Sequence, residues 1–456
     1  MSEQTVEKQQ WGSAFGFIMT SIGYAVGVGA IWKFPYMIGM NGGGMFLLVC
    51  ILMGIFICIP LAWAELTLGR YTQTSAIVGM RQLAGKGSPW VLFGWFGFAA
   101  CFTMISYYIT IVGDVLFYIF KFVTGGLAGM SIEEMSAYYN SVNTNMGIKI
   151  GMAALMFIVT AAVLWFGVQK GLEAANKILI PMLFIFLVIL GIRGLMLPGG
   201  MEGITWLFTP DFSLLSPELL IAALNQCFFL AGVGLASLFS FGGYLDPKDS
   251  DIPFSGTVII MSNFVVAVLA GVAIFPALFS YDMDITQGAG LVFQTLPYVF
   301  NDMSMGTLWG ALFFLLLFAA GWSSVLGLME GSVSAISDAF KMTRKKTLLI
   351  LSVLCFILSF PTIFSTTYWV DIRPLNMDLY TFMDFLAICI FCPLSGIFLA
   401  VYTTFKFPFS KFVAESSVGA KYFHVPGILK YWLGIILPII TLILIITGIG
   451  SYTGLW

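Results

Sequence analysis

Long apolar runs, separated by short polar segments, extend along nearly the whole chain. An α-helix needs about 20 apolar residues to cross a hydrocarbon core about 30 Å thick, whereas a membrane β-strand alternates over about ten residues. The pattern therefore predicts an all-α integral membrane protein with about eleven spans. We expect them at residues 12–37, 42–70, 89–123, 148–168, 175–197, 216–244, 253–281, 305–340, 346–366, 376–406 and 428–453.

The composition agrees with a membrane protein and limits the chemistry. The chain is 59% hydrophobic and 9% charged, whereas soluble domains carry about 25% charged residues. The cysteines all lie in apolar runs, and His424 is the single histidine. A disulfide framework, a His/Cys metal centre and an organic cofactor are therefore not expected. Residues 1–10 are polar, and the apolar run after them is too long for a cleavable signal peptide.

Basic residues predict the orientation in the membrane. Most of them, such as Arg81, Lys86 and Lys345, fall in connections on one side, whereas the opposite connections carry acids such as Glu133 and Glu134. Basic connections stay in the cytoplasm. We therefore expect a multi-pass cell-membrane protein with a cytoplasmic amino terminus and an extracellular carboxyl terminus. The longer polar stretches at 131–145 and 198–217 are expected outside.

A glycine-rich interruption occurs twice at matching places. Residues 25–30 read Ala-Val-Gly-Val-Gly-Ala in the first span, and residues 231–236 read Ala-Gly-Val-Gly-Leu-Ala in the sixth. A single such motif is typical of close helix packing. A matched pair that enters from opposite sides favours two inverted halves, at 12–197 and 216–406, with the span at 428–453 added. The single domain would then hold a central site between two broken helices.

Broken helices create binding groups for ions. A break exposes backbone N–H groups at the start of one half-helix and carbonyl groups at the end of the other. The first attract an anion and the second a cation. Unpaired polar groups in hydrocarbon cost several kcal/mol, so a break persists where a ligand, an ion or water completes it. The pattern predicts a secondary transporter for a small negatively charged solute, with a cation or proton site nearby.

Motifs along the chain resemble the neurotransmitter:sodium symporter family, in its bacterial eleven-span form. The resemblance extends over nearly the whole chain and implies a LeuT-type fold with a 5+5 inverted repeat and discontinuous first and sixth helices. It rests on residues 11–13 (WGS), 27–35 (GVGAIWKFP), 41–44 (NGGG), 65–71 (ELTLGRY), 226–229 (QCFF), 320–324 (AGWSS) and 383–385 (MDF).

The resemblance implies a substrate site. The substrate carboxylate would lie on the backbone amides of Val28 and Gly29 and on the Tyr108 hydroxyl, beneath an aromatic lid formed by Phe229. The remaining pocket residues would be Tyr24, Ala25, Met104, Gly232, Leu235, Ser324 and Leu328. For Met104 and Leu328 ordinary helix packing is the competing interpretation.

The resemblance also implies two gates. Lys33 and Asp384 would pair on the outer side. Lys8 and Asp338 would pair on the inner side, together with Trp11 and Tyr244. Lys33 replaces the usual arginine, so its contact is a point charge without a bidentate fork. Glu330, about two helical turns after the serine pair, is either a proton carrier or part of a polar lining.

The ion sites are where the chain departs from the family. The second sodium site has its carbonyls and hydroxyls at Gly23, Val26, Ala320, Ser323 and Ser324, which suit Na⁺. The first site is expected to be dismantled, because side-chain oxygens are missing at Ala30 and Leu230 and only Ser262 offers one. Chloride coupling is not expected, because the residues at the family's chloride positions lack most of the hydroxyl donors that the anion needs. These residues are Cys50, Gln226, Leu230, Ser262 and Val266.

These departures change the expected substrate and coupling. Gly232 stands where many relatives have a hydroxyl, and Tyr24 stands where a small polar residue is usual. We therefore expect symport of a small amino acid or an amino-acid-like carboxylate, apolar or aromatic, coupled to one Na⁺ at the second site or to H⁺.

Other classes of function are less well supported. A channel needs a pore with a selectivity ring. An enzyme needs clustered chemistry, yet Asp114, Glu65 and Glu330 lie on different spans. A sensor that binds without transporting would carry the same binding residues and remains the main alternative. The expected partners are a carboxylate solute and the lipid bilayer, with no nucleic acid and no obligatory protein partner.

Overall fold

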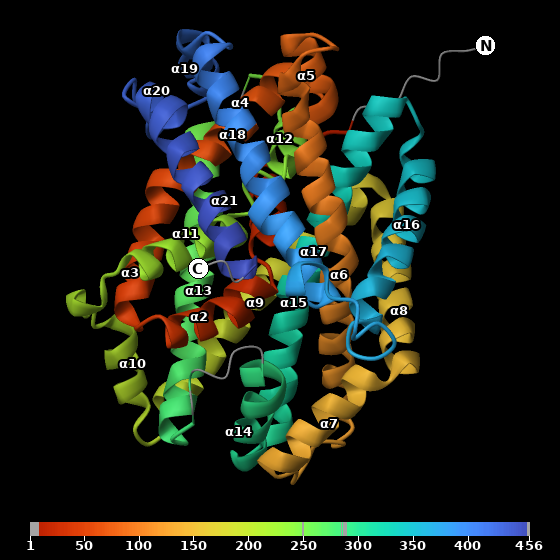
Figure 1. Cartoon of the computed structure of the whole chain (residues 1–456), viewed down its shortest axis with the longest axis vertical. Coiled ribbons are helices and arrows are strands. Elements are labelled where there is room, and N and C mark those ends of the chain that lie inside the picture. Colours follow the sequence, from red (N-terminus) through yellow and green to blue (C-terminus); the bar gives the residue numbers. More distant parts are fainter. Residues whose placement is uncertain (1–8, 249, 284, 286–289, 454–456) are drawn as a thin grey trace.

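A computed structural model describes residues 9–248, 250–283, 285 and 290–453. In this part of the chain the secondary structure is helical, and no β-strand occurs. The helices pack side by side into one bundle (Figure 1). The described amino-terminal end lies at the same end of the bundle as the short helices α5 (Ala76–Ala84) and α19 (Phe409–Ser416), and α7 (Ile132–Thr144) and α14 (Leu296–Asp302) lie at the other end.

The predicted spans all correspond to helical segments. Over the described residues, nine helices are long and apolar enough to cross a membrane, and a bent pair adds a tenth span. The nine are Gly44–Thr72 (α3, η2, α4), Pro89–Val123 (η3, α6), Met146–Trp165 (α8), Val168–Leu195 (η4, α9), Ile252–Ser280 (α13), Gly306–Phe340 (α15), Arg344–Phe364 (α16), Leu379–Phe405 (α17, η8, α18) and Leu429–Gly450 (α20, η9 and part of α21, Leu437–Thr453).

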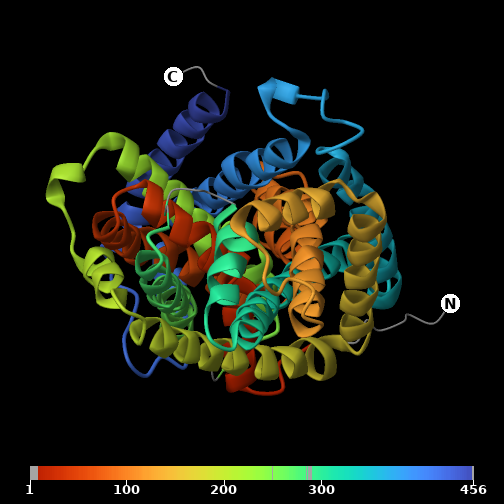
Figure 2. The same ribbon diagram turned by 90° about the horizontal axis from the view of Figure 1, so that it is seen from below.

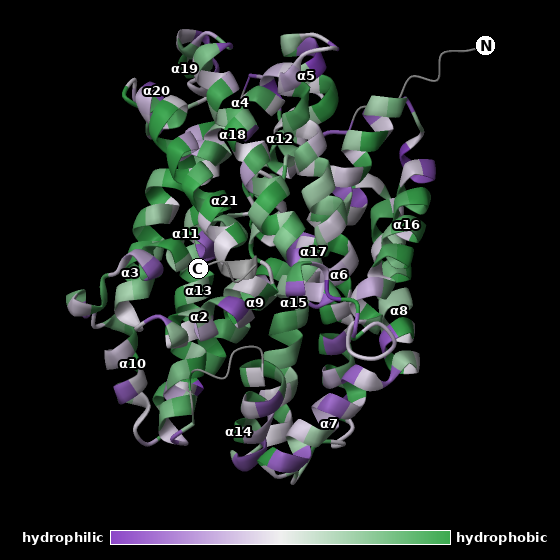
Figure 3. Cartoon of the chain, in the orientation of Figure 1, coloured by the Kyte–Doolittle hydropathy of each residue, from purple (hydrophilic) through white to green (hydrophobic). Residues whose placement is uncertain are grey.

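An apolar band surrounds the bundle, as a bilayer requires. Hydrophobic residues occupy the middle of the molecule, and hydrophilic residues gather toward the two ends (Figure 3). Large apolar side chains such as Phe166, Ile178 and Ile185 are more than half exposed. Exposure of such side chains is costly in water and favourable in lipid, so this surface is the one that faces the membrane.

The first span is broken where the sequence predicted. Helix α1 (Ala14–Ala25) ends at Val26, and the chain resumes as a helix at Gly29 through η1 (Gly29–Lys33) and α2 (Phe34–Met40). The two parts are bent by 53°. The missing turn leaves the amide of Val28 without a partner in its own helix, which is the first requirement of the predicted site.

The sixth span is broken as well. Helix α11 (Pro217–Ala231) and helix α12 (Ser237–Gly243) are separated by residues 232–236. Gly232 and Gly234 have φ values of +62° and +80°, which glycine adopts at no steric cost. Ala236 has φ of +58°, and an L side chain pays about 1 kcal/mol or more for this conformation.

The breaks lie within a scaffold of long helices. Helix α15 (Gly306–Phe340) packs along α6 (Leu92–Val123) and α9 (Ala174–Leu195), and α1 packs against α15, α9 and α13. Figure 2, viewed along the bundle, shows helices from both halves of the chain surrounding the centre. The broken segments are therefore enclosed by helices that are distant in sequence.

Two of the expected polar connections contain helices. Residues 131–145 include α7 (Ile132–Thr144), and residues 198–217 include α10 (Gly200–Phe208). At Ser131 the side chain accepts from the Glu134 amide at 3.2 Å, and the Glu134 carboxylate accepts from the Ser131 amide at 2.8 Å. This reciprocal cap explains why α7 begins there, and its Ser-x-x-Glu spacing is visible in the sequence.

Candidate substrate and ion sites

The amide at the first break meets the hydroxyl predicted to bind a carboxylate beside it. The Val28 backbone N–H donates to the Tyr108 Oη at 2.5 Å, and both residues are buried. A Cβ atom at Gly27 would lie 2.6 Å from the Tyr108 Oη, so glycine is required for this approach. The Tyr108 hydroxyl therefore satisfies a backbone donor that a substrate carboxylate could also use.

The predicted pocket residues surround one small cavity. All of them except Val28 line a cavity of about 20 Å³, which is close to the space of one water molecule. Its lining is Tyr24, Ala25, Gly27, Gly29, Ala30, Met104, Tyr108, Phe229, Leu230, Gly232, Leu235, Ser324 and Leu328. Residues that the sequence analysis grouped into one pocket therefore do lie together, on α1, α6, α11 and α15 and at the two breaks.

Tyr24 closes the side of this cavity that is nearer to Trp11. Its hydroxyl donates to the Gly232 carbonyl oxygen at 2.5 Å and thereby connects the two breaks. Its ring contacts Phe241 edge-on at 5.5 Å between centroids, and Phe241 in turn contacts Trp11 at 5.4 Å. Tyr24 is 3% exposed. The cavity floor is therefore an aromatic side chain held by a hydrogen bond.

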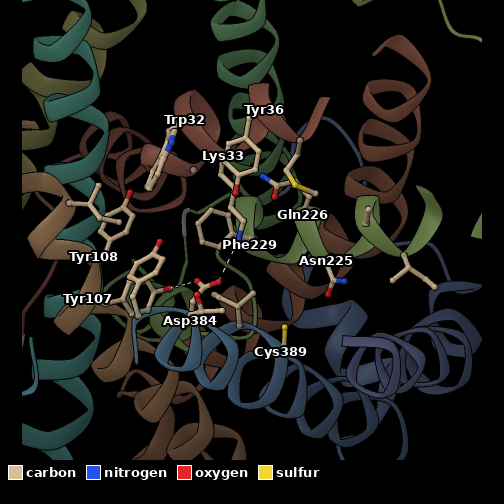
Figure 4. Close-up of a pocket in the computed structure, with 18 of the residues that line it drawn as sticks. Trp32, Lys33, Tyr36, Tyr107, Tyr108, Asn225, Gln226, Phe229, Asp384 and Cys389 are labelled. Atoms are coloured by element: carbon tan, nitrogen blue, oxygen red, sulfur yellow. Dashed lines mark hydrogen bonds and ion pairs between the residues drawn. The ribbon is translucent and has the colours of Figure 1, made fainter. Parts of the chain in front are cut away.

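Phe229 lines both the small cavity and a larger vestibule of about 730 Å³, whose lining residues are drawn in Figure 4. Lys33 Nζ lies 4.3 Å from the centre of the Phe229 ring and 3.6 Å from Asp384 Oδ2. The Tyr107 hydroxyl donates to Asp384 Oδ1 at 2.8 Å. The predicted outer pair is therefore formed, and it rests on the aromatic lid, where a cation–π contact contributes about 1 kcal/mol.

The predicted ligands of the second sodium site converge on one carbonyl. Ser323 Oγ and Ser324 Oγ each donate to the Gly23 carbonyl oxygen at 3.0 Å, and Ser323 Oγ also lies 2.9 Å from the Ala320 carbonyl oxygen. Val26 lies at the end of the same half-helix. Four oxygens, two from carbonyls and two from hydroxyls, are thus close enough to bind one hard cation such as Na⁺.

The resemblance assigned Ser262 to the family's first sodium site, but its neighbour Asn263 is the residue that contacts both breaks. The side-chain amide of Asn263 on α13 reaches both breaks: its Nδ2 donates to the Ala25 carbonyl oxygen at 2.9 Å and to the Leu230 carbonyl oxygen. Asn263 Oδ1 is buried and has no hydrogen-bond partner among the described residues. The expectation for Ser262 rested on its position in the sequence alone. The rotation of α13 about its own axis, which directs Asn263 toward the breaks, is set by tertiary packing.

The inner side is closed by aromatic and charged groups. Trp11 Nε1 donates to the Phe241 carbonyl oxygen at 3.0 Å, and Trp11 packs on Tyr244 with ring centroids 5.9 Å apart. Asp338 Oδ2 accepts from the Ser75 amide at 3.0 Å. The predicted partner of Asp338, Lys8, lies outside the described residues, so that pair stays a prediction.

Glu330 is fully buried and has a cationic partner. The guanidinium of Arg344, at the start of α16 (Arg344–Phe364), forms an ion pair with Glu330 Oε2, and the Tyr244 hydroxyl donates to Glu330 Oε1 at 3.1 Å. Arg344 also donates to the Leu164 carbonyl oxygen at 2.5 Å. Both carboxylate oxygens of Glu330 are thus engaged by neighbouring side chains, and this geometry favours the polar-lining interpretation of Glu330 over the proton carrier.

Two carboxylates that fasten the broken helices were not predicted. Glu65 Oε1 accepts from the Gly234 amide at 2.6 Å and Oε2 from the Phe239 amide at 3.3 Å, at the second break. Glu173 Oε2 accepts from the Gly12 amide at 2.7 Å and Oε1 from the Ser13 hydroxyl at 3.0 Å, at the foot of α1. An intramembrane acid is a sequence signal for function, but its partners are distant in sequence.

The geometry defines a class of protein. Two helices broken at the centre of a membrane bundle, with a closed cavity between an outer and an inner barrier, form the architecture of an alternating-access transporter. The chain belongs to the sodium:neurotransmitter symporter family, whose model matches residues 8–145 and 130–455. It is a transporter and not an enzyme.

Known relatives agree with this assignment. The chain is 35% identical to the uncharacterized sodium-dependent transporter YhdH of Bacillus subtilis, over 99% of both chains. It is 30% identical to the sodium-dependent serotonin transporter of Drosophila melanogaster, over 77% of this chain and 63% of that one. The solved structure of MhsT in complex with L-phenylalanine is 35% identical and matches with a TM-score of 0.89, covering 96% of this chain and 99% of that chain. The predicted LeuT-type fold is confirmed.

Proposed function

We propose that this protein is a secondary active symporter that imports a small amino acid or a related carboxylate, with one Na⁺ at the second sodium site as the coupling ion. One observation carries the proposal. On either side of the same break, Val28 meets Tyr108, and Gly23 meets Ser323 and Ser324. An expected anion site and an expected cation site thus lie on the six-residue segment from Gly23 to Val28.

Shared backbone explains coupling. The two serine hydroxyls currently donate to the Gly23 carbonyl oxygen. A bound Na⁺ would take that oxygen as a ligand, and the hydroxyls would turn their lone pairs to the ion. This change fixes the end of α1, and therefore the position of the Val28 amide. Each ligand would then stabilise the conformation that the other requires.

The first sodium position is weaker than the second. Asn263 supplies a carboxamide and the Ala25 and Leu230 carbonyls supply oxygens, but Ala30 has no side-chain oxygen to add. With the Asn263 amide donating to both carbonyls, the break is satisfied without an ion. This supports a stoichiometry of one Na⁺ per substrate. Coupling to H⁺ is the alternative, and the Glu330–Arg344 pair argues against Glu330 as its carrier.

Alternating access would use the two barriers around the cavity. The outer barrier is Phe229 with Lys33 and Asp384, and the inner barrier is Trp11 with Tyr244. The carboxyl-binding amide lies between them. Movement of the broken segments against α6 and α15 would open one barrier while the other stays closed. We place the amino terminus in the cytoplasm, on the side of Trp11.

Flux measurements on the purified protein in liposomes test this proposal. Uptake of a radiolabelled amino-acid mixture should follow an inward Na⁺ gradient and should persist when the H⁺ gradient is collapsed. Binding without accumulation would identify a sensor. Uptake driven by H⁺ alone, or two Na⁺ per substrate by flux ratio, would overturn the proposed coupling.

A further inference from the structure

We infer that Tyr24 limits the size of the substrate, so that the site favours small side chains over large ones. The inference rests on the proposed function, because it assigns the substrate class of the same cavity. It differs from the expectation of an aromatic substrate, which came from the Met, Phe and Leu residues in the wall. The observations that carry it are the position of Tyr24 and the way its neighbours hold it.

Tyr24 takes up space in the lining of the cavity, beside Gly232. The polar end is formed by Gly27, Gly29, Tyr108 and Ser324, around the Val28 amide. Met104, Leu235 and Leu328 supply the apolar part of the lining, and the Tyr24 ring lies beside Gly232. About 20 Å³ remains within this lining. A substrate whose carboxylate lies on Val28 therefore has little space for a side chain directed at Tyr24.

The cavity is more tightly packed on the side of Tyr24 than on the side of Phe229. On its own side, Phe229 borders a vestibule of about 730 Å³. On the opposite side, the Tyr24 ring packs against Phe241, and its hydroxyl is bonded to Gly232 at 2.5 Å. The packed Tyr24 side therefore offers no free space for a larger substrate side chain, whereas space on the other side lies beyond Phe229, the expected lid.

Two glycines leave space for Tyr24 alone. A Cβ atom at Gly327 would lie 2.6 Å from the Tyr24 Cβ, and a Cβ atom at Gly232 would lie 3.1 Å from the Tyr24 ring. At both positions a side chain larger than that of glycine would be in very close contact with Tyr24. The Tyr24 side chain is therefore a built part of the pocket, and it takes the volume that a larger substrate side chain would need.

Equilibrium binding to the purified full chain in saturating Na⁺ tests the inference. The probes are glycine, L-alanine, L-leucine and L-phenylalanine, with propionate and 3-phenylpropionate as matched acids without an amino group. Wild-type protein should bind the small member of each series at least about ten-fold tighter than the large one, a typical penalty for excess apolar volume in a fixed pocket. Tyr24→Ala should bring leucine or phenylalanine to at least the affinity of alanine.

Matched variants separate volume from hydrogen bonding. Tyr24→Phe keeps the ring and loses the hydroxyl, so it should retain the preference for small substrates. Tyr24→Leu serves the purpose of Tyr24→Ala if the alanine variant does not fold. Equal or tighter binding of phenylalanine by wild-type protein, or an unchanged preference in both enlarged variants, would overturn the inference and leave the proposed function standing. Failure of every probe to bind wild-type protein and variants alike would overturn both.

Discussion

The Tyr108 hydroxyl lies 2.5 Å from the backbone nitrogen of Val28, where the first span is broken. The contact joins a side chain of α6 to a backbone donor that no residue of its own helix satisfies. It places a phenol and an amide N–H where both can bind the same carboxylate. The following predictions test the roles that we assign around this contact.

Tyr108→Phe should weaken carboxylate binding by about ten- to hundred-fold, since a hydrogen bond to a charged group contributes about 1.5–3 kcal/mol. Binding of the best probe ligand in saturating Na⁺ measures the effect. Tyr118→Phe is a matched control on the same helix, because its hydroxyl donates to the Phe293 carbonyl oxygen at 3.2 Å, away from the break. Equal losses in both variants would contradict a direct role for Tyr108.

Ser323→Ala should raise the Na⁺ concentration that half-activates uptake by about ten-fold or more, because a buried cation loses one oxygen ligand. Ser337→Ala is the matched control: Ser337 is buried on the same helix, and its hydroxyl bonds only to the Ser334 carbonyl oxygen in the contacts observed. The Na⁺ dependence of initial uptake rates distinguishes the two. A normal Na⁺ response in Ser323→Ala would place the coupling ion elsewhere.

Asn263→Ala should lower protein stability by about 1–3 kcal/mol, because the Ala25 and Leu230 carbonyls lose their shared donor. Ser262→Ala, one residue away, should leave both stability and Na⁺ dependence close to wild type. Thermal unfolding in detergent and the Na⁺ titration of uptake measure the two properties. A larger effect of Ser262→Ala than of Asn263→Ala would show that Ser262, and not Asn263, is the residue that acts at the breaks.

Lys33→Met should speed dissociation of bound substrate, because the outer barrier loses both its contact with Asp384 at 3.6 Å and its contact with the Phe229 ring. The pair is partly exposed, so the coupling energy in a Lys33→Met and Asp384→Asn double-mutant cycle should be only about 1 kcal/mol. Dissociation rates after isotopic dilution provide the measurement. Additive effects of the two substitutions would show that the residues act independently.

Glu330→Gln should reduce the transport rate and leave its pH dependence unchanged, because the Arg344 guanidinium loses its buried counter-charge. Uptake at a fixed Na⁺ gradient over a range of pH measures both properties. Restoring part of the rate with Glu330→Gln combined with Arg344→Gln would confirm the charge pair. A flattened pH profile in Glu330→Gln would instead assign the proton to this carboxylate.

The apolar pattern predicted the spans well because hydrocarbon forces the backbone to satisfy itself within each helix. The two breaks were also predicted, since glycine motifs are local signals: Gly232 and Gly234 adopt positive φ at the second break, and Gly27 allows the close approach of Tyr108 at the first. Helices α7 and α10 were missed. Their polar composition hides them from a hydropathy criterion, although the cap at Ser131 was readable.

Side-chain partners were harder to predict from residue positions. The Glu330–Arg344 pair joins two adjacent helices of the chain, and Asn263 reaches carbonyls on two others. Whether Ser262 or Asn263 faces the breaks depends on a rotation of about 100° per residue along α13, which follows from 3.6 residues per turn. Local pattern does not fix that rotation in a helix that is apolar nearly all round.

The sequence by itself determined that this chain spans the membrane and breaks two of its helices, because these properties follow from hydropathy and from glycine, which act locally. Tertiary structure alone decided which donors and acceptors meet at the breaks and how much space they enclose. The Tyr24 hydroxyl on the Gly232 carbonyl is the clearest case, since it joins residues 208 positions apart. Such contacts depend on how helices pack, and packing is a property of the whole bundle.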